Sequence, residues 1–201
     1  MKNLIINKCI NTITDINPDY DKDKIDEIRY GLEGIYLSLT KVIVILVICL
    51  LLNIIKEALI ILLLFNGLRA FAFGIHASKS WMCWISSSIL FIGIPYLCMN
   101  LNLSVYIHYF IIIFSFICFL LYAPADTKKR PLVKKNRRIK FKLLTIIMSI
   151  IYLFIFINTS SIFLQNAITS TMLMEAVLIH PLTYRVFNLP YKNYESYVFS
   201  K

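Results

Sequence analysis

Glycine and acidic residues are both scarce in this 201-residue chain, which has 5 Gly and 11 Asp or Glu against 21 Lys or Arg. Hydrophobic residues make up 59% of it, and the mean hydropathy is +0.73. Such a chain cannot be intrinsically disordered, because disorder requires low hydrophobicity. It is also too apolar for a single water-soluble domain or a disulfide-rich mini-protein. The net charge of +10 does not indicate nucleic acid as a partner, because membrane proteins carry basic loops for a reason of their own.

Motifs for metals and cofactors are missing as well. None of the five cysteines belongs to a CxxC pair, and their spacing matches no zinc site. We therefore expect no metal and no organic cofactor. The sequence contains no direct or inverted repeat of the kind found in many transporters. No apolar run carries the EExxxR-like glutamate pair of CAAX-type membrane proteases.

Long apolar runs, separated by short polar or basic links, make up most of the chain. A membrane-spanning helix needs about 17–25 residues, and six runs approach this length: 36–55, 58–73, 82–99, 103–122, 141–157 and 160–180. They predict an all-α polytopic membrane protein with about six transmembrane or re-entrant helices. The second run is short and interrupted by Asn66-Gly67 and Arg69, and the last is diluted by polar residues. Four crossings are therefore the alternative.

The first 35 residues form amphipathic stripes instead of a continuous apolar run. One stripe covers 4–16, and a second covers 25–35, after a helix start at Asn17-Pro18. We interpret both as helices in the membrane interface; the alternative is a pair of cytosolic helices packed on the rest of the protein. The predicted organisation is an interfacial segment, a membrane-embedded domain and a cytoplasmic tail, at 1–35, 36–182 and 183–201.

Basic residues determine the expected orientation in the membrane. Nine Lys or Arg residues lie between Lys128 and Lys142, and the positive-inside rule places this basic loop, 123–142, in the cytoplasm. Counting back through two spans places segment 69–83 on the same side, together with both termini. We expect the loop also to contact anionic lipids.

The candidate nucleophile is Cys83, which follows a short polar stretch and begins an apolar run. With Ser80 as N-cap, Cys83 falls in the first turn of a helix, where the positive helix end favours the nucleophilic thiolate. Lys79 and His76 add to this effect. On one continuous helix seven residues rise about 10.5 Å, so His76 can reach the sulfur only if the chain breaks between them. Spacing alone leaves a chance pairing of the two residues open.

Three features around this pair follow one another along the chain: Arg69, then Gly-Ile-His-Ala at 74–77, then Cys83. Their order resembles the R…GGxHA…C signature of the accessory gene regulator B (AgrB) family of quorum-sensing membrane endopeptidases. A second block, Ala-Pro-Ala-Asp-Thr-Lys-Lys-Arg-Pro at 123–131, is similar to another stretch of that family. One departure is Phe73, where the family usually has the first Gly of the pair, and it bears on the flexibility of the loop.

The resemblance implies a function as well as a family. It implies that His76 and Cys83 are a catalytic dyad in a multi-pass protein of the bacterial cell membrane, acting as a homodimer on an AgrD-like propeptide. In that mechanism Cys83 attacks a peptide carbonyl, and His76 passes the thiol proton to the leaving amine of the C-terminal tail. A thiol or hydroxyl of the substrate then displaces Cys83 and closes a thiolactone or lactone ring.

Four residues near the dyad are candidates for binding substrate or supporting the oxyanion: Arg69, Gly74, Lys79 and Ser80. The donors we expect for the oxyanion are the amides at the start of the Cys83 helix. Arg69 has two other interpretations, because it can hold the loop itself or extend to the membrane surface from a helix end.

More distant candidates are Glu175, Asp126, Lys129 and Arg130. A glutamate inside an apolar run is costly in lipid, so Glu175 is a functional candidate unless it makes an interhelical hydrogen bond. The other three belong to the block at 123–131, and the basic loop around them can also steer an acidic substrate tail.

Two functions of other classes stay open. The chain can be a small permease that exports a peptide or an ion, with Arg69 and Glu175 in its path, or a membrane scaffold without catalysis. The dyad discriminates between these classes, because a permease or scaffold should tolerate Cys83→Ala and Cys83→Ser.

Overall fold

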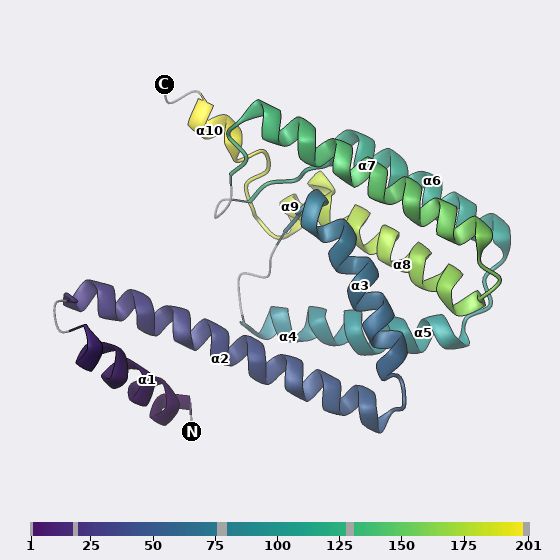
Figure 1. Cartoon of the computed structure of the whole chain (residues 1–201). Coiled ribbons are helices and arrows are strands. Elements are labelled where there is room, and N and C mark those ends of the chain that lie inside the picture. The colour runs from purple at the N-terminus through teal and green to yellow at the C-terminus, as the bar shows by residue number, and fades with distance from the viewer. Residues whose placement is uncertain (1, 18–19, 76–79, 128–130, 199–201) are drawn as a thin grey trace. The chain divides into compact units, whose positions relative to one another are not determined.

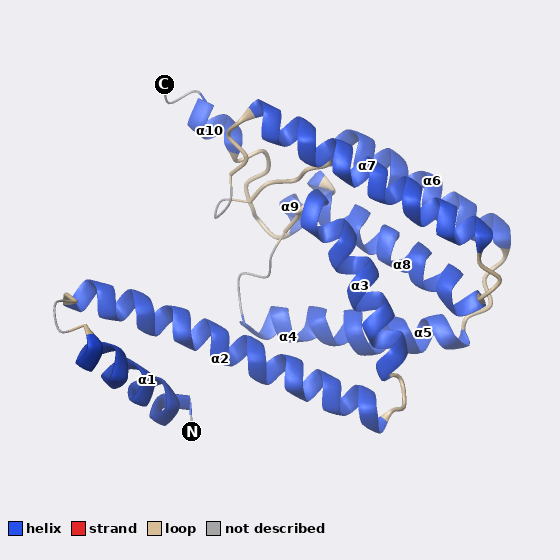
Figure 2. Cartoon of the chain, in the orientation of Figure 1, coloured by secondary structure: helices blue, strands red, loops and turns tan. Residues whose placement is uncertain are grey.

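The structure is a computed structural model, and it describes residues 2–17, 20–75, 80–127 and 131–198. Within these ranges the chain forms ten α-helices, one π-helical turn and no β-strand (Figure 2). The predicted all-α fold is confirmed. The chain divides into two compact units, Met1–Leu51 and Leu52–Lys201.

The first unit consists of α1 (Lys2–Ile16) and α2 (Lys22–Leu51). Lys2 forms a 2.9 Å ion pair with Glu33, and the guanidinium of Arg29 donates a 2.8 Å hydrogen bond to the side-chain oxygen of Asn7. The second amphipathic stripe and the first apolar run are one continuous helix here, not two separate elements. No proline interrupts this stretch, so nothing in the sequence forces a break at residue 35.

The second unit contains the remaining elements (Figure 1). They are α3 (Ile55–Ala72), α4 (Ser80–Ser88), the π turn η1 (Ile89–Gly93), α5 (Ile94–Asn100), α6 (Val105–Tyr122), α7 (Lys135–Asn158), α8 (Ile162–Ile179), α9 (Pro181–Val186) and α10 (Tyr194–Val198). Helix α4, the turn η1 and helix α5 follow one another without a break in the chain.

Five helical segments in the described part of the chain are long and apolar enough to cross a membrane. They correspond to five of the six predicted runs: Asp23–Leu51, Trp81–Asn100, Val105–Tyr122, Lys135–Asn158 and Ile162–Ile179. The remaining run, 58–73, corresponds to α3, whose 18 residues include Lys56, Glu57 and Arg69. The chain is therefore a helical membrane protein, and α3 differs from the five spanning candidates because each of those contains 18 consecutive residues with at most two charged side chains.

Helix α8 lies at the centre of the second unit, where α3, α5 and α6 pack against it (Figure 1). Ala167 and Ala176 are completely buried, and small residues at such positions allow neighbouring helices to approach closely. The polar residues of α8 face other helices, as a diluted apolar run requires. The side-chain amide of Asn166 donates to the carbonyls of Cys98 and Leu101 at 2.9 and 2.8 Å.

A second close approach joins α3 to α7. The hydroxyl of Tyr152 on α7 donates a 2.6 Å hydrogen bond to the carbonyl of Leu64 and lies directly against Gly67. A side chain at Gly67 would collide with this hydroxyl, so the glycine allows the contact. Gly67, in the Asn66-Gly67 pair that interrupts the second run, is thus part of a helix–helix interface.

Candidate functional site

The first element of the site is the sharp turn that follows α3. Phe73 has φ 64° and ψ −117°, and Gly74 has φ 95°. Only glycine adopts such conformations without a steric penalty, so Phe73 holds a strained conformation that costs on the order of 1–3 kcal/mol. Its ring lies edge-on against Phe141 of α7, with the centroids 4.9 Å apart. Phe73, the one departure from the signature that the first motif resembles, therefore has a backbone conformation that is typical of glycine.

Gly74 is required for a second reason, because no side chain fits there. A Cβ atom at this position would lie 2.7 Å from the guanidinium Nη1 of Arg69 and 3.0 Å from the carbonyl oxygen of Leu178. Real Cβ atoms essentially never approach other atoms closer than 3.0 Å. The glycine of the first motif thus lets the turn sit against both α3 and α8.

Backbone hydrogen bonds join this turn to the second motif and to α8. The amide of Gly74 donates to the carbonyl of Ala125 at 2.8 Å, and the amide of Ala125 donates to the carbonyl of Ala72 at 2.9 Å. The amide of Ile75 donates to the carbonyl of Leu178 at 3.3 Å. The residues just before His76 are therefore held from two sides by segments that are distant in sequence.

Arg69 and Glu175 reinforce the same turn from inside the protein. The Nη1 atom of Arg69 lies 3.5 Å from Oε2 of Glu175, whose side chain is completely buried. The Nη2 atom of Arg69 donates to the carbonyl of Ile75 and lies 3.5 Å from that of Gly74. Among the described residues the second carboxylate oxygen, Oε1, has no hydrogen-bond partner. Arg69 thus links a buried carboxylate to the carbonyls of the turn.

Cys83 lies in the first turn of α4, which begins at Ser80. Its side chain is half-buried, whereas those of Cys49, Cys98 and Cys118 are buried. The first four backbone N–H groups of a helix have no partner within the helix itself, and Cys83 belongs to this first turn of α4. His76 and Lys79 lie outside the described residues, and their proposed roles stay predictions.

Asp126 of the second motif is almost completely buried and accepts three backbone hydrogen bonds. The donors are the amides of Leu132, Asn193 and Tyr194, at 3.2, 2.9 and 2.9 Å. Its carboxylate therefore connects the second motif to the segment after α9. Lys129 and Arg130, the other two candidates of this motif, lie outside the described residues.

Sequence reasoning missed the contribution of Tyr184 on α9. Its side chain is 1% exposed, and its hydroxyl lies 3.2 Å from the carbonyl of Ala125 and 3.0 Å from that of Asp126. Burial raises the pKa of this phenol, so it remains a donor at neutral pH. The sequence expectation treats residues 183–201 as a tail, and only the clustering of tyrosines after residue 183 could have indicated that this segment packs on the motif.

The position of Cys83 suits covalent chemistry. Among the described residues no group of three or more His, Cys, Asp or Glu side chains could hold a metal ion. A half-buried thiol at a helix start, close in sequence to a rigidly held turn, is the kind of site in which a cysteine nucleophile and a histidine base can work together.

Comparison with known proteins gives one family. A family model described as accessory gene regulator B matches residues 6–179. The chain is 30% identical over 168 residues to an AgrB-like protein of Clostridium acetobutylicum, covering 84% of this chain and 80% of that protein. It is 32% identical over 161 residues to accessory gene regulator protein B of Staphylococcus saprophyticus, covering 80% of this chain and 82% of that protein.

A third relative is an AgrB-like protein of Listeria innocua, 28% identical over 177 residues that cover 88% of this chain and 87% of that protein. No solved structure matches the chain. The matched region includes both motifs and ends at residue 179, so α9, α10 and Tyr184 lie beyond it.

Proposed function

Because the chain belongs to the accessory gene regulator B family, we propose that it is a membrane-embedded cysteine endopeptidase that cleaves and cyclises a signalling propeptide. The family acts in the agr quorum-sensing system, so an AgrD-related peptide is the partner. The observation that carries the proposal is the site itself: Cys83 is half-buried in the first turn of α4, and the turn that leads to His76 is fixed by hydrogen bonds.

In the proposed reaction, His76 takes the proton of the Cys83 thiol, and the thiolate attacks a carbonyl carbon of the propeptide. The tetrahedral intermediate then breaks its C–N bond, and the protonated His76 gives the proton to the leaving amine. The C-terminal tail of the substrate departs, and the remaining peptide is held as a thioester on Cys83.

Ring closure follows by exchange at the same carbonyl. A thiol or hydroxyl within the bound peptide attacks the thioester, His76 removes its proton, and the Cys83 thiolate leaves and is reprotonated. The products are a thiolactone or lactone and the free enzyme. Water at this step would give a linear acid instead, and apolar helices around the site disfavour that side reaction.

The supporting residues have separate tasks in this proposal. Backbone amides at the start of α4 donate to the developing oxyanion. Arg69 positions the turn through the carbonyls of Gly74 and Ile75, and Glu175 positions Arg69. We further propose that the site and both termini face the cytoplasm and that the active form is a homodimer.

A permease or scaffold that takes part in peptide export is the second candidate. The observation that favours it is the number of polar side chains buried along α8, which include Asn166, Thr169 and Glu175. Polar residues inside a membrane protein often mark a transport path. A transport path through these residues would not need Cys83. The effect of replacing Cys83 therefore distinguishes the two functions.

The test uses an affinity-tagged AgrD-like precursor, co-expressed with the wild-type chain, Cys83→Ala, His76→Ala or Cys9→Ala. Cys9 is exposed on α1 and provides a matched cysteine control. We expect wild type and Cys9→Ala to cleave the precursor and yield a product lighter by one water than the linear peptide. Cleavage that persists in both dyad variants would overturn the proposal and favour the permease or scaffold.

A further inference from the structure

A hollow of about 300 Å³ lies between the end of α6, the second motif, the start of α7 and the segment after α9. Three cationic side chains line it, Arg138, Lys142 and Lys192, together with several tyrosines. The proposed peptidase reaction does not use this hollow.

Among the described residues that line the hollow, Asp126 is the one acidic side chain, and backbone amides bind its carboxylate. Both carboxylate oxygens of Asp126 accept backbone hydrogen bonds, at distances of 2.9 to 3.2 Å. Lys192 forms a 3.5 Å ion pair with the exposed Glu195. The Nη1 atom of Arg138 donates to the carbonyls of Leu132 and Val133, and its guanidinium lies 4.0 Å from the ring centroid of Tyr194.

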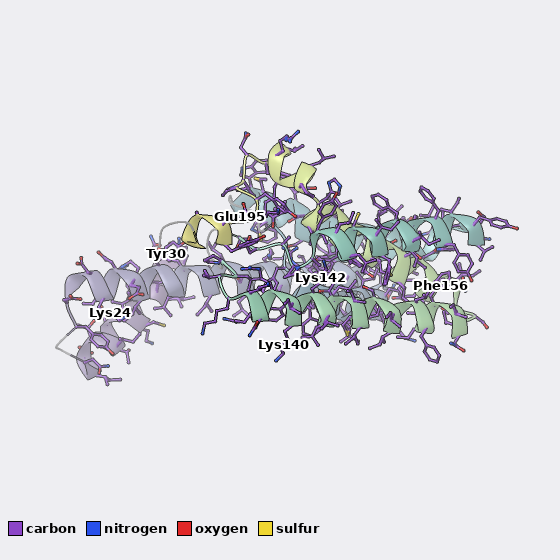
Figure 3. The ribbon with its side chains drawn as sticks, turned by 90° about the horizontal axis from the view of Figure 1, so that it is seen from above. Lys24, Tyr30, Lys140, Lys142, Phe156 and Glu195 are labelled. Carbon is purple, nitrogen blue, oxygen red and sulfur yellow. The ribbon has the colours of Figure 1, made fainter. Side chains whose placement is uncertain are left out.

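Lys142 differs from the other two cations. It is half-buried on α7, and among the described residues no carboxylate forms an ion pair with it. Figure 3 shows Lys142 on the side of α7 that faces α6, whereas Lys140 lies on the opposite side. A half-buried ammonium group that forms no ion pair in the described part of the chain, four residues along α7 from the guanidinium of Arg138, is a favourable position for an anion.

Apolar side chains line the hollow as well. Leu121 at the end of α6 and Ile139 at the start of α7 both line it, and they are 63% and 50% exposed. Both belong to helices that are long and apolar enough to span the membrane. A ligand here therefore meets exposed apolar side chains together with cationic and tyrosine side chains.

We propose that this hollow is a binding site for the phosphate headgroup of an anionic phospholipid, with Lys142 as its principal contact. The acyl chains then lie against Leu121 and Ile139. Basic pockets between membrane helices bind anionic headgroups in this way. An acidic peptide would use the cations but not the exposed apolar side chains, so the combination favours a lipid.

Occupancy of this site has a structural consequence. Two of its walls are the second motif and residues 191–194. The carboxylate of Asp126 joins these two segments by accepting hydrogen bonds from the amides of Asn193 and Tyr194. The motif in turn holds the Gly74 turn through Ala125. A bound lipid thus stabilises the segment on which the turn depends.

The experiment measures lipid retention by native mass spectrometry of the full-length chain in detergent. The probes are phosphatidylglycerol and, as a zwitterionic control, phosphatidylcholine. One basic residue near an anionic surface contributes about 1 kcal/mol, so we expect Lys142→Gln to weaken phosphatidylglycerol retention about fivefold. Lys140→Gln, the matched control on the same helix, should retain the lipid as wild type does, and so should Lys142→Arg.

Several outcomes would overturn the proposal. These are equal retention of both lipids by wild type, equal loss in Lys140→Gln and Lys142→Gln, or loss in Lys142→Arg as large as in Lys142→Gln. Inorganic phosphate that binds wild type through Lys142 while phosphatidylglycerol is not retained would assign the hollow to a free anion. An Asp- and Glu-rich peptide whose binding, unlike that of the lipid, depends on Lys142 would assign it to a peptide.

Discussion

At the scale of single residues, the contact between Arg69 and Glu175 determines how the turn before His76 is held. A guanidinium has five donors in a fixed fork, so one Arg69 side chain can reach a carboxylate and two carbonyls at once. Lysine cannot reproduce this geometry. The carboxylate of Glu175 lies beside Arg69 and is completely buried, so neither lipid nor solvent reaches it.

This arrangement predicts the effect of Glu175→Gln, which keeps the volume and removes the charge. Breaking a buried ion pair on one side costs about 3 kcal/mol, because the partner's charge is left uncompensated. We expect a clear fall in the thermal stability of the detergent-solubilised chain, together with slower propeptide cleavage. Thermal denaturation and the cleavage assay measure the two effects.

The matched control is Glu195→Gln, which removes the exposed partner of Lys192. Exposed ion pairs contribute less than about 1 kcal/mol, so this variant should behave as wild type does. If both variants lose the same stability, or if Glu175→Gln loses none, the pair does not have the role assigned to it.

Some features at the scale of single residues can be predicted from the sequence, and others cannot. The start of the Cys83 helix at Ser80 was expected, because a polar stretch followed by an apolar run is a local signal. The hydrogen bonds from Gly74 to Ala125 and from Ile75 to Leu178 were not, because they join segments far apart in the chain and have no local signature. For the same reason the sequence left open whether Glu175 had a partner.

At the scale of elements, α9 and the segment after it pack against the motif and do not form a free tail. Tyr184 contributes a buried hydroxyl to the carbonyls of Ala125 and Asp126. Its ring lies edge-on against Tyr191, with centroids 5.2 Å apart, and burial raises the pKa of Tyr191 to about 12. Both phenols are therefore protonated at neutral pH.

We expect Tyr184→Phe to destabilise the protein by about 1–2 kcal/mol, because two buried carbonyls lose their hydroxyl donor while the ring contact remains. Tyr191→Phe is the matched control, since its hydroxyl has no hydrogen-bond partner among the described residues. The measurement is thermal unfolding of both variants in the same detergent. Equal unfolding temperatures for the two would contradict the role given to the Tyr184 hydroxyl.

Element boundaries show where sequence patterns are informative. The apolar runs correspond closely to helices, because hydrophobicity over about 20 residues is a strong and local signal. The continuity of α2 across residue 35 was missed, since an amphipathic stripe and an apolar run are both helical and differ only in what surrounds them. The short helices α9 and α10 were missed because five or six residues carry too little periodicity.

At the scale of the whole molecule, the number of membrane crossings depends on α3. Five helical segments are long and apolar enough to span, and α3 is a sixth long helix with three charged residues. Six crossings place the two termini on the same side of the membrane, and five place them on opposite sides. The basic loop predicts which side is the cytoplasm.

We predict that both termini are cytoplasmic. The measurement is protease digestion of terminal tags in inverted and right-side-out membrane vesicles, with a third tag in the basic loop as a reference for the cytoplasmic side. Both terminal tags should be digested only in inverted vesicles, as the loop tag is. Digestion of the two terminal tags in opposite preparations would mean that α3 does not cross the membrane.

The buried polar residues of α8 also have a consequence for how the protein enters the membrane. Polar and charged residues within an apolar helix oppose its insertion into lipid, and α8 contains Asn166 and Glu175. In the folded protein Arg69 contacts Glu175, and the side-chain amide of Asn166 donates hydrogen bonds to the carbonyls of Cys98 and Leu101. These partners all lie earlier in the chain than α8. We therefore expect α8 to enter the membrane more readily in the presence of the preceding helices than as an isolated segment.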